Sequence, residues 1–346
     1  MSGAVNRRVF LNTLAAAPAL AGLPEAASRP PRKVIVGTVM QAFWVEHPGV
    51  TRRLRELSGI VDDMQKQSRQ NHGRGLDVAI LPEVAVTGEA SRQSRLRAVP
   101  LKGEFGEVFA AKAREHGCYI VAATYLQESG GGVSNAAVLF GRKGEVAGIY
   151  RKVHLVVSPG STDFENDCTP GSTVPVFDCD FGKLGIQICY DIEFDYGWNE
   201  LARNGAELIA FTTQSPQTSQ PACRAMHNRC YIVSSTWRSN ATVFEPTGKI
   251  AAQIRPPDRI LVHELDLSYA ILPWHPKLQK GEALRSKYGE KVGFRYYEDE
   301  DCGLFWSNDP RTPIAEMAKS IGVPEAEASL ERVRGIYREK RVAGYK

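Results

Sequence analysis

The sequence lacks the features that mark several large classes of protein. It has no CxxC pair, which excludes zinc-ribbon and thioredoxin-like sites. Its net charge of +4 over 346 residues is small, and this argues against a nucleic-acid-binding surface or a polybasic membrane surface. No internal repeat is apparent, and no apolar run reaches the roughly 20 residues that a membrane-spanning helix needs. A hydrophobic content of 43% and a charged content of 24% instead indicate a globular chain with a full-sized core.

The N-terminal residues predict export. The pair Arg7-Arg8, followed by Phe10, is close to a twin-arginine signal, and a short alanine-rich apolar run covers residues 13–23. We expect residues 1–30 to be a signal peptide and linker, and the protein to be periplasmic or secreted. The alternative is a basic tail on a cytoplasmic protein. Export would permit disulfides, although at least one of the seven cysteines stays unpaired in a monomer because seven is odd.

Strand-like and helix-like segments alternate over residues 31–268, which predicts an α/β domain with mixed sheets flanked by helices. Strands are expected at residues 34–39, 78–81, 119–124, 136–140, 146–150, 174–178, 184–189, 208–212, 231–236, 241–244 and 260–265. Helices are expected at residues 50–71, 107–116 and 221–229, and between Phe194 and Gly205. Residues 269–346 are expected to form an irregular extension that ends in a helix and packs on this domain or on a partner subunit.

A cysteine stands at the end of one predicted strand. The strand 184–189 ends on Cys189, and a helix and a second strand follow. Strand ends of this kind are where α/β proteins often keep their chemistry. By itself, a cysteine in this position is more often a small core residue than a nucleophile.

Two other strand ends carry charged residues, Glu83 and Lys152, and Glu165 lies in the loop between Lys152 and Cys189. Taken singly, these residues are explained by a helix cap, a solvated charge and a loop acid. Taken together, they supply what a cysteine nucleophile needs. A glutamate acts as base, a lysine holds the oxyanion, and the backbone N–H of Tyr190 offers a second oxyanion donor.

Three motifs in this order resemble the nitrilase, or carbon–nitrogen hydrolase, superfamily: LPEVAVTGE (81–89), YRKVHL (150–155) and GIQICYDIEF (185–194). The resemblance covers about residues 33–267. It implies an α–β–β–α sandwich that forms four layers when two subunits meet across a helical face. It therefore implies a homodimer or a higher homo-oligomer, with a small molecule as the other partner and with no nucleic acid and no membrane insertion.

The resemblance also implies a role for each residue. Glu83 is the general base, Lys152 the oxyanion stabiliser and Cys189 the nucleophile, and Glu165 resembles a second glutamate that orients the lysine and the substrate. A carbonyl substrate would form a thioester on Cys189, release ammonia or an amine, and then be hydrolysed by water. This chemistry needs no metal and no organic cofactor.

The residues after the nucleophile, Tyr190-Asp191, resemble the amidase and carbamoylase branches, so we expect a small amide or N-carbamoyl substrate. The family's usual Arg-Ala-x-Glu-Asn stretch appears as 224–228, RAMHN, and its glycine- and serine-rich segment as 236–240, TWRSN. Both segments help to shape the pocket, so they leave the substrate class open.

Four alternatives stay open. The first is a nitrilase that acts on a nitrile, and the second is an inactive binding or assembly protein on the same scaffold. The third is a metal site on one helical face, formed by Cys223, His227 and Cys230 at i, i+4 and i+7. The fourth is a papain-like dyad in which His154 or His227 pairs with Cys189.

Overall fold

A computed structural model describes residues 29–88 and 94–344. The predicted signal sequence lies almost entirely outside these residues. In the described part of the chain, no helix has both the length and the apolar character needed to cross a membrane.

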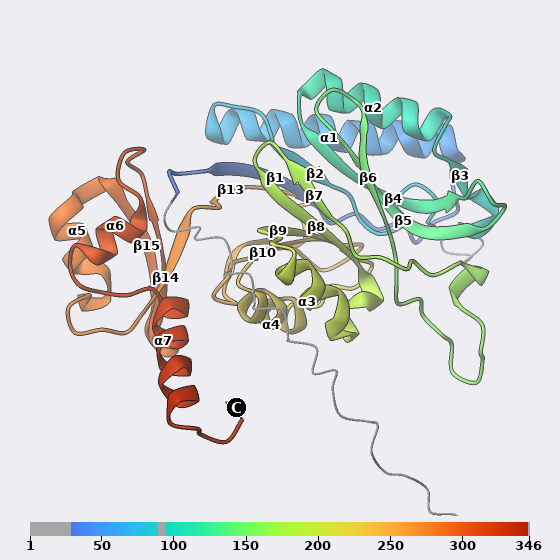
Figure 1. Cartoon of the computed structure of the whole chain (residues 1–346). Coiled ribbons are helices and arrows are strands. Elements are labelled where there is room, and N and C mark those ends of the chain that lie inside the picture. The colour runs from blue at the N-terminus through green and yellow to red at the C-terminus, as the bar shows by residue number, and fades with distance from the viewer. Residues whose placement is uncertain (1–28, 89–93, 345–346) are drawn as a thin grey trace, which may run out of the picture.

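The main body is two β-sheets packed face to face, with helices on both outer faces (Figure 1). The first sheet has the order β13-β1-β2-β4-β5-β6, and β3 pairs with β4; the second has the order β12-β11-β10-β9-β8-β7. The strands of the first sheet are β1 (Lys33–Val39), β2 (Val78–Ile80), β3 (Val99–Pro100), β4 (Tyr119–Gln127), β5 (Val133–Phe140), β6 (Val146–Arg151) and β13 (Ile260–Asp266). Those of the second are β7 (Val176–Cys179), β8 (Gly182–Ile188), β9 (Leu208–Thr212), β10 (Tyr231–Ser235), β11 (Ala241–Phe244) and β12 (Ile250–Ile254).

Helices α1 (Val50–His72) and α2 (Glu104–His116) cover the first sheet, and α3 (Asp195–Arg203) and α4 (Ser219–Asn228) cover the second (Figure 1). This is the predicted α–β–β–α arrangement, and the predicted fold class is confirmed. The sequence did not predict β3 and β12. Strand β3 is only two residues long, and β12 is a partly exposed edge strand.

The alternation of side chains along each strand builds two separate layers of core. Along β1, Val34 and Val36 point into the space between the sheets, whereas Ile35 and Val39 pack beneath the outer helices. The helix α1 completes the outer layer with a buried apolar stripe that includes Leu57. The first sheet is therefore buried on both faces, which is why its central strands are mostly apolar.

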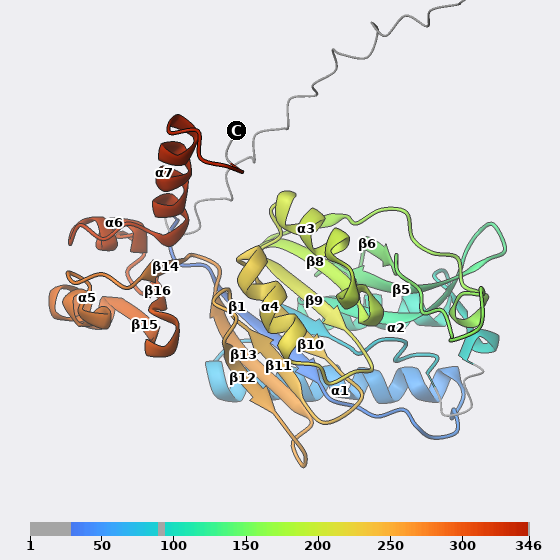
Figure 2. The same ribbon diagram turned by 90° about the horizontal axis from the view of Figure 1, so that it is seen from below.

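The C-terminal residues form a small module beside the sandwich, where an irregular extension was expected. Strands β14 (Tyr269–Pro273), β15 (Val292–Tyr297) and β16 (Cys302–Ser307) make an antiparallel sheet of order β14-β16-β15. Helices α5 (Glu282–Tyr288) and α6 (Ile314–Lys319) enclose a hydrophobic cluster of its own, and α7 (Ala326–Glu339) projects from the module (Figure 2). The expectation of irregular structure was wrong because β14 and β16 pair across separations of 29 residues, for Pro273 opposite Cys302, to 37 residues, for Tyr269 opposite Trp306. Packing against a partner subunit stays a prediction.

Candidate active site

The two sheets bring the predicted site residues together at one end of the sandwich. Strands β2 and β6 run parallel to each other, so the segments that leave them, carrying Glu83 and Lys152, reach the same edge of the first sheet. The Nζ atom of Lys152 lies 3.1 Å from Oε1 of Glu83, and each residue is 1% exposed. Strand β8 of the second sheet delivers Cys189 near both groups, whose charges act on its thiol.

Glu165 and Asn135 complete a buried polar cluster around Lys152. The lysine Nζ donates to Oε1 and Oε2 of Glu165 at 2.9 and 3.2 Å. Asn135, on β5, donates through Nδ2 to Glu83 Oε1 at 2.9 Å and to Glu165 Oε1 at 3.0 Å. Its backbone carbonyl also accepts from the Lys152 N–H at 2.8 Å. Asn135 therefore orders both carboxylates and the lysine backbone.

The sequence prediction missed Asn135. This residue directly precedes the strand predicted at residues 136–140, and the structure extends that strand to include it. A buried amide needs hydrogen-bond partners, and the partners of Asn135 lie 52 residues upstream and 30 residues downstream in the chain.

Lys152 keeps its positive charge in this site. Burial by itself disfavours the charged form, but the negative charges of Glu83, of the Cys189 thiolate when it forms, and of Glu165 raise the pKa of Lys152 well above its ordinary value. An ammonium has three protons, and three carboxylate oxygens accept from Nζ, one on Glu83 and two on Glu165. The longest of these contacts, 3.2 Å to Glu165 Oε2, is the one that an acceptor on a bound ligand would replace most easily.

Cys189 sits on a strained turn. Its φ of +42° is in the left-handed region, which is uncommon for a residue with a side chain, and it begins a 3-10 turn, Cys189–Glu193, that leads into α3. Burial raises the pKa of the Cys189 thiol to about 12, and the nearby Glu83 charge adds to this increase. Lys152, the Thr213 hydroxyl and the Gln214 backbone N–H act in the opposite direction. The thiol is therefore protonated at neutral pH and needs a base before it can attack.

Glu83 is placed to be that base. Its Oε2 atom is buried and has no hydrogen-bond partner among the residues that the structure describes, whereas Oε1 is occupied by Lys152 and Asn135. A buried carboxylate oxygen without a partner is costly in a folded protein, so it is usually retained for a purpose. The free oxygen can accept the proton of a thiol or of a water molecule.

Side chains from other segments donate hydrogen bonds to the backbone that carries Glu83. The indole Nε1 of Trp237 donates to the Glu83 carbonyl at 2.9 Å, and Arg53 Nη1 donates to the carbonyls of Ala85 and Gly88 at 2.9 and 3.0 Å. A Cβ atom on Gly88 would lie 2.5 Å from the Trp237 ring, so only glycine fits there. The absence of a side chain at Gly88 therefore makes room for the Trp237 ring.

The two residues after Cys189 lie in different surroundings. Tyr190 is 36% exposed, and its ring packs edge-on against Phe194 with centroids 5.5 Å apart. Asp191 is 0% exposed, and its carboxylate is bonded inside the protein by Tyr150 and His154, among others. Tyr190 therefore reaches the surface beside the site, whereas Asp191 supports the site from within.

The alternative of a metal site at Cys223, His227 and Cys230 is not supported, because the described residues do not bring these three side chains together. Helix α4 ends at Asn228, and Arg229 adopts a left-handed φ of +50°, which takes Cys230 off the helical face and into the core. Within residues 29–88 and 94–344, the structure groups metal-ligand atoms only at Asp62, Glu115 and His116. The Nζ atom of Lys112 already bonds both acids there, at 2.8 to 3.0 Å.

No hydrogen bond joins a histidine to Cys189 in the described part of the chain. The ring of His154 is stacked on Phe194, 4.0 Å between centroids, and its Nδ1 contacts Asp191 Oδ1 at 3.0 Å. This geometry gives no support to a papain-like dyad. No disulfide joins any of the seven cysteines, all of which lie in the described part of the chain.

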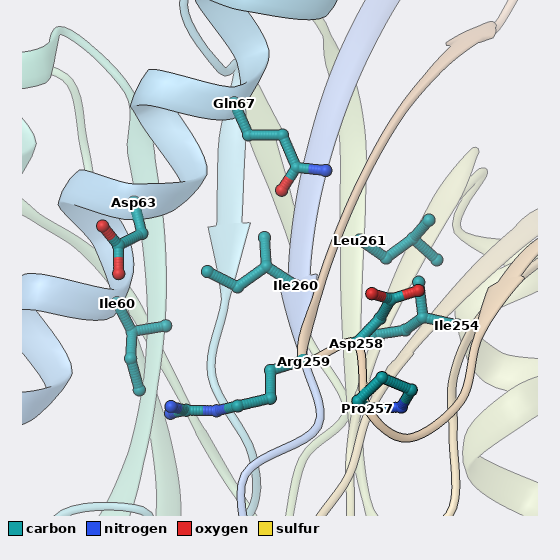
Figure 3. A pocket seen from close by; sticks show the side chains of 9 residues that line it. All are labelled: Ile60, Asp63, Gln67, Ile254, Pro257, Asp258, Arg259, Ile260 and Leu261. Atoms are coloured by element: carbon teal, nitrogen blue, oxygen red, sulfur yellow. The ribbon is translucent and has the colours of Figure 1, made fainter.

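A separate surface hollow lies between α1 and the β12–β13 turn (Figure 3). Its walls are formed by Ile60, Asp63, Gln67, Ile254, Pro257, Asp258, Arg259, Ile260 and Leu261. None of these residues belongs to the cluster around Lys152, so the hollow is not part of the candidate active site.

Solved structures of the nitrilase superfamily have the same α–β–β–α fold. Nit3 of Saccharomyces cerevisiae matches with a TM-score of 0.59 at 19% identity, over 75% of this chain and 95% of that chain. An amidase from Nesterenkonia matches with a TM-score of 0.57 at 21% identity, over 69% and 92%. At such identities the likeness shows the fold alone.

Sequence relatives extend the likeness to the family. Omega-amidase NIT2-A of Xenopus laevis is 27% identical over 218 residues, 57% of this chain and 79% of the relative. Omega-amidase NIT2 of Homo sapiens is 25% identical over 221 residues, 58% and 80% of the two chains. A profile of the Carbon-nitrogen hydrolase family matches residues 44–272. The chain therefore belongs to the carbon–nitrogen hydrolase family, enzymes that act on carbon–nitrogen bonds other than peptide bonds, and the predicted family is confirmed.

Proposed function

We propose that this enzyme hydrolyses a small amide through a thioester on Cys189, with Glu83 as general base and Lys152 as oxyanion stabiliser. The observation that carries the proposal is the pairing of a protonated thiol with an unpartnered oxygen of Glu83 beside a charged lysine. A thiol of this kind is a poor nucleophile until a neighbouring base removes its proton.

In the acylation half-reaction, Glu83 takes the thiol proton as the Cys189 sulfur attacks the carbonyl carbon. The C=O electron pair moves to oxygen, and the Tyr190 N–H and the Lys152 Nζ proton that bonds Glu165 Oε2 in this structure donate to this oxyanion. When the oxyanion collapses, the C–N bond breaks and Glu83 passes its proton to the leaving nitrogen. Ammonia departs and the acyl group stays on sulfur.

In the deacylation half-reaction, a water molecule attacks the thioester and Glu83 takes one of its protons. The same donors hold the second oxyanion. The C–S bond breaks, the thiolate regains a proton from Glu83, and the carboxylic acid is released. Glu165 acts by holding Lys152 in place through both of its oxygens.

An amide is favoured over the other substrate classes by the relatives. Two of them are omega-amidases, and one solved neighbour is an amidase. The second candidate is an N-carbamoyl compound, because Tyr190-Asp191 after the nucleophile is typical of both branches. Nitrile hydrolysis and a purely binding role have no comparable support.

Product analysis on purified protein tests the proposal. We expect ammonia without carbon dioxide from simple and terminal amides, whereas an N-carbamoyl substrate would release both. Acid-quenched intact-mass spectrometry should detect the acyl group, and Cys189→Ala should lower kcat about 10⁶-fold and abolish the adduct. Cys223→Ala, at an exposed cysteine on α4, is the matched control. No ammonia from any amide, or turnover by Cys189→Ala, would refute the proposal.

We further propose that the protein is exported by the twin-arginine route and assembles as a homo-oligomer. Replacing Arg7 and Arg8 by lysine should retain the protein in the cytoplasm, as measured by cell fractionation. Sedimentation of the purified protein should give a mass of at least two chains, and a monomer at all concentrations would contradict the assembly.

A further inference from the structure

Asp191 is a fully buried carboxylate that accepts hydrogen bonds from both sheets. Its side chain is 0% exposed. Its Oδ2 accepts from the Tyr150 hydroxyl at 2.7 Å and from the Ile188 N–H at 3.1 Å. Its Oδ1 accepts from the His154 backbone N–H at 2.9 Å and contacts His154 Nδ1 at 3.0 Å.

These donors flank two of the residues that the mechanism uses. Tyr150 and His154 are two residues before and two residues after Lys152; Tyr150 lies on β6 of the first sheet, and His154 lies in the segment that leaves that strand. Ile188 directly precedes Cys189 at the end of β8 in the second sheet. One carboxylate is therefore bonded to both sides of the lysine segment and to the strand end that delivers the nucleophile.

We propose that Asp191 is a positioning residue that sets the placement of Cys189 relative to Lys152. The inference rests on the proposed function, because it assigns Asp191 to the support of those two residues. Cys189 has a left-handed backbone that its local sequence does not favour, so the surrounding bonds must hold it. The bond from Ile188 N–H to Asp191 closes this turn, and the bonds to Tyr150 and His154 fix the turn against the lysine segment.

The geometry requires a carboxylate at this position. An asparagine has one acceptor oxygen, so its Nδ2 would face donors that now bond a carboxylate oxygen. The Tyr150 hydroxyl already accepts from Gln187 Nε2 at 3.2 Å, so its own proton is committed to Asp191. Burial, and then the Asp191 charge, raise the pKa of Tyr150 well above its ordinary value, so this proton stays available.

The test compares Asp191→Asn with Tyr150→Phe, which keeps the carboxylate and removes one donor. Because a misplacement of about 1 Å can cost about 100-fold in rate, we expect Asp191→Asn to lower kcat about 100-fold. Tyr150→Phe should lower it by about tenfold, and KM should change less than threefold in both. Glu245→Gln is the matched control, since Glu245 is a 0% exposed carboxylate bonded by Arg295 and Thr247, away from the site. It should leave kcat unchanged.

A second readout separates this inference from the proposed function. Alkylation by iodoacetamide, followed by peptide mass spectrometry, gives the rate at Cys189 relative to the exposed Cys223 in the same molecule. We expect the Cys189 to Cys223 ratio to fall about tenfold in Asp191→Asn, because Glu83 no longer faces the thiol. This assay needs no amide, so it reports positioning even if the wild type cleaves none.

Three results would overturn the inference. The first is that Asp191→Asn has the same alkylation ratio and the same kcat per folded molecule as the wild type. Another is a raised KM at unchanged kcat, which would make Asp191 a substrate contact. If Asp191→Asn does not fold, Tyr150→Phe carries the test, and an unchanged kcat and alkylation ratio in that variant count against the inference.

Discussion

The two sheets of the sandwich contribute unlike parts of the candidate active site. The first sheet supplies Glu83, Asn135 and Lys152, each 1% exposed and each bonded to the others. The second supplies Cys189, which is partly exposed and lies on a strained turn. The charged groups are thus buried and hydrogen-bonded to one another, whereas the proposed nucleophile is partly exposed. Under the proposed mechanism, catalysis depends on how the two sheets are held against each other.

Removing the base from the first sheet should have the largest effect among the tests that follow. A positioned general base contributes about 10²- to 10⁴-fold, so we expect Glu83→Gln to lower kcat about 10³-fold. Rapid quenched-flow measurements with acid should show that the acyl-enzyme forms slowly. The control is Asp62→Asn, which also removes a carboxylate bonded to a lysine, Lys112, but outside the site. A Glu83→Gln variant with wild-type acylation would assign the base elsewhere.

Removing hydrogen bonds from the charged groups of the first sheet, without removing a charge, should lower kcat by a smaller factor. Asn135→Ala takes one hydrogen bond each from the carboxylates of Glu83 and Glu165. Hydrogen bonds to charged groups contribute about 1.5 to 3 kcal/mol, so kcat should fall about 10- to 100-fold. Asn135→Asp should be worse, because it adds a third carboxylate to the cluster. If steady-state kinetics found both variants equal to wild type, the carboxylates would not need the amide.

Titration of Cys189 tests whether its side chain is a thiol or a thiolate at neutral pH. The thiol pKa is raised to about 12 from its ordinary value of 9.0, so the deprotonated form should be absent at pH 8 and emerge only above about pH 10. The difference in absorbance at 240 nm between wild type and Cys189→Ala measures it. A thiolate signal at pH 7 would show a preformed ion pair with Lys152 and would remove the need for Glu83 as base.

The C-terminal module should matter least for catalysis. Arg295 on β15 bonds the buried Glu245 with two nitrogens at 3.0 and 2.6 Å and so joins the module to the sandwich. Arg295→Leu leaves that carboxylate short of donors, which should lower the free energy of unfolding by about 1 to 3 kcal/mol. We expect a lower Tm by calorimetry with kcat unchanged. A parallel loss of kcat would show that the module also shapes the site.

The sequence predicted the parts of the site that local motifs carry. Glu83, Lys152 and Cys189 each follow a recognisable apolar strand, and strand ends of α/β sheets gather at one edge, so their meeting was expected. Most strands and helices were also predicted, because periods of 2.0 and 3.6 residues are visible over short windows. The catalytic roles themselves stay predictions until the variants are measured.

What only the tertiary structure decided depends on partners far apart in the chain. Asn135 lay just before the strand predicted at residues 136–140, and its importance comes from carboxylates 52 and 30 residues away. Asp191 looked like a clue to the substrate, and folding instead buried it between donors from two sheets. The C-terminal sheet, likewise, exists through pairing between β14 and β16 that no short window contains. The sequence by itself determined which reactive groups are present, because their identity is local. The tertiary structure decided how they are held, because hydrogen bonds form between neighbours in space.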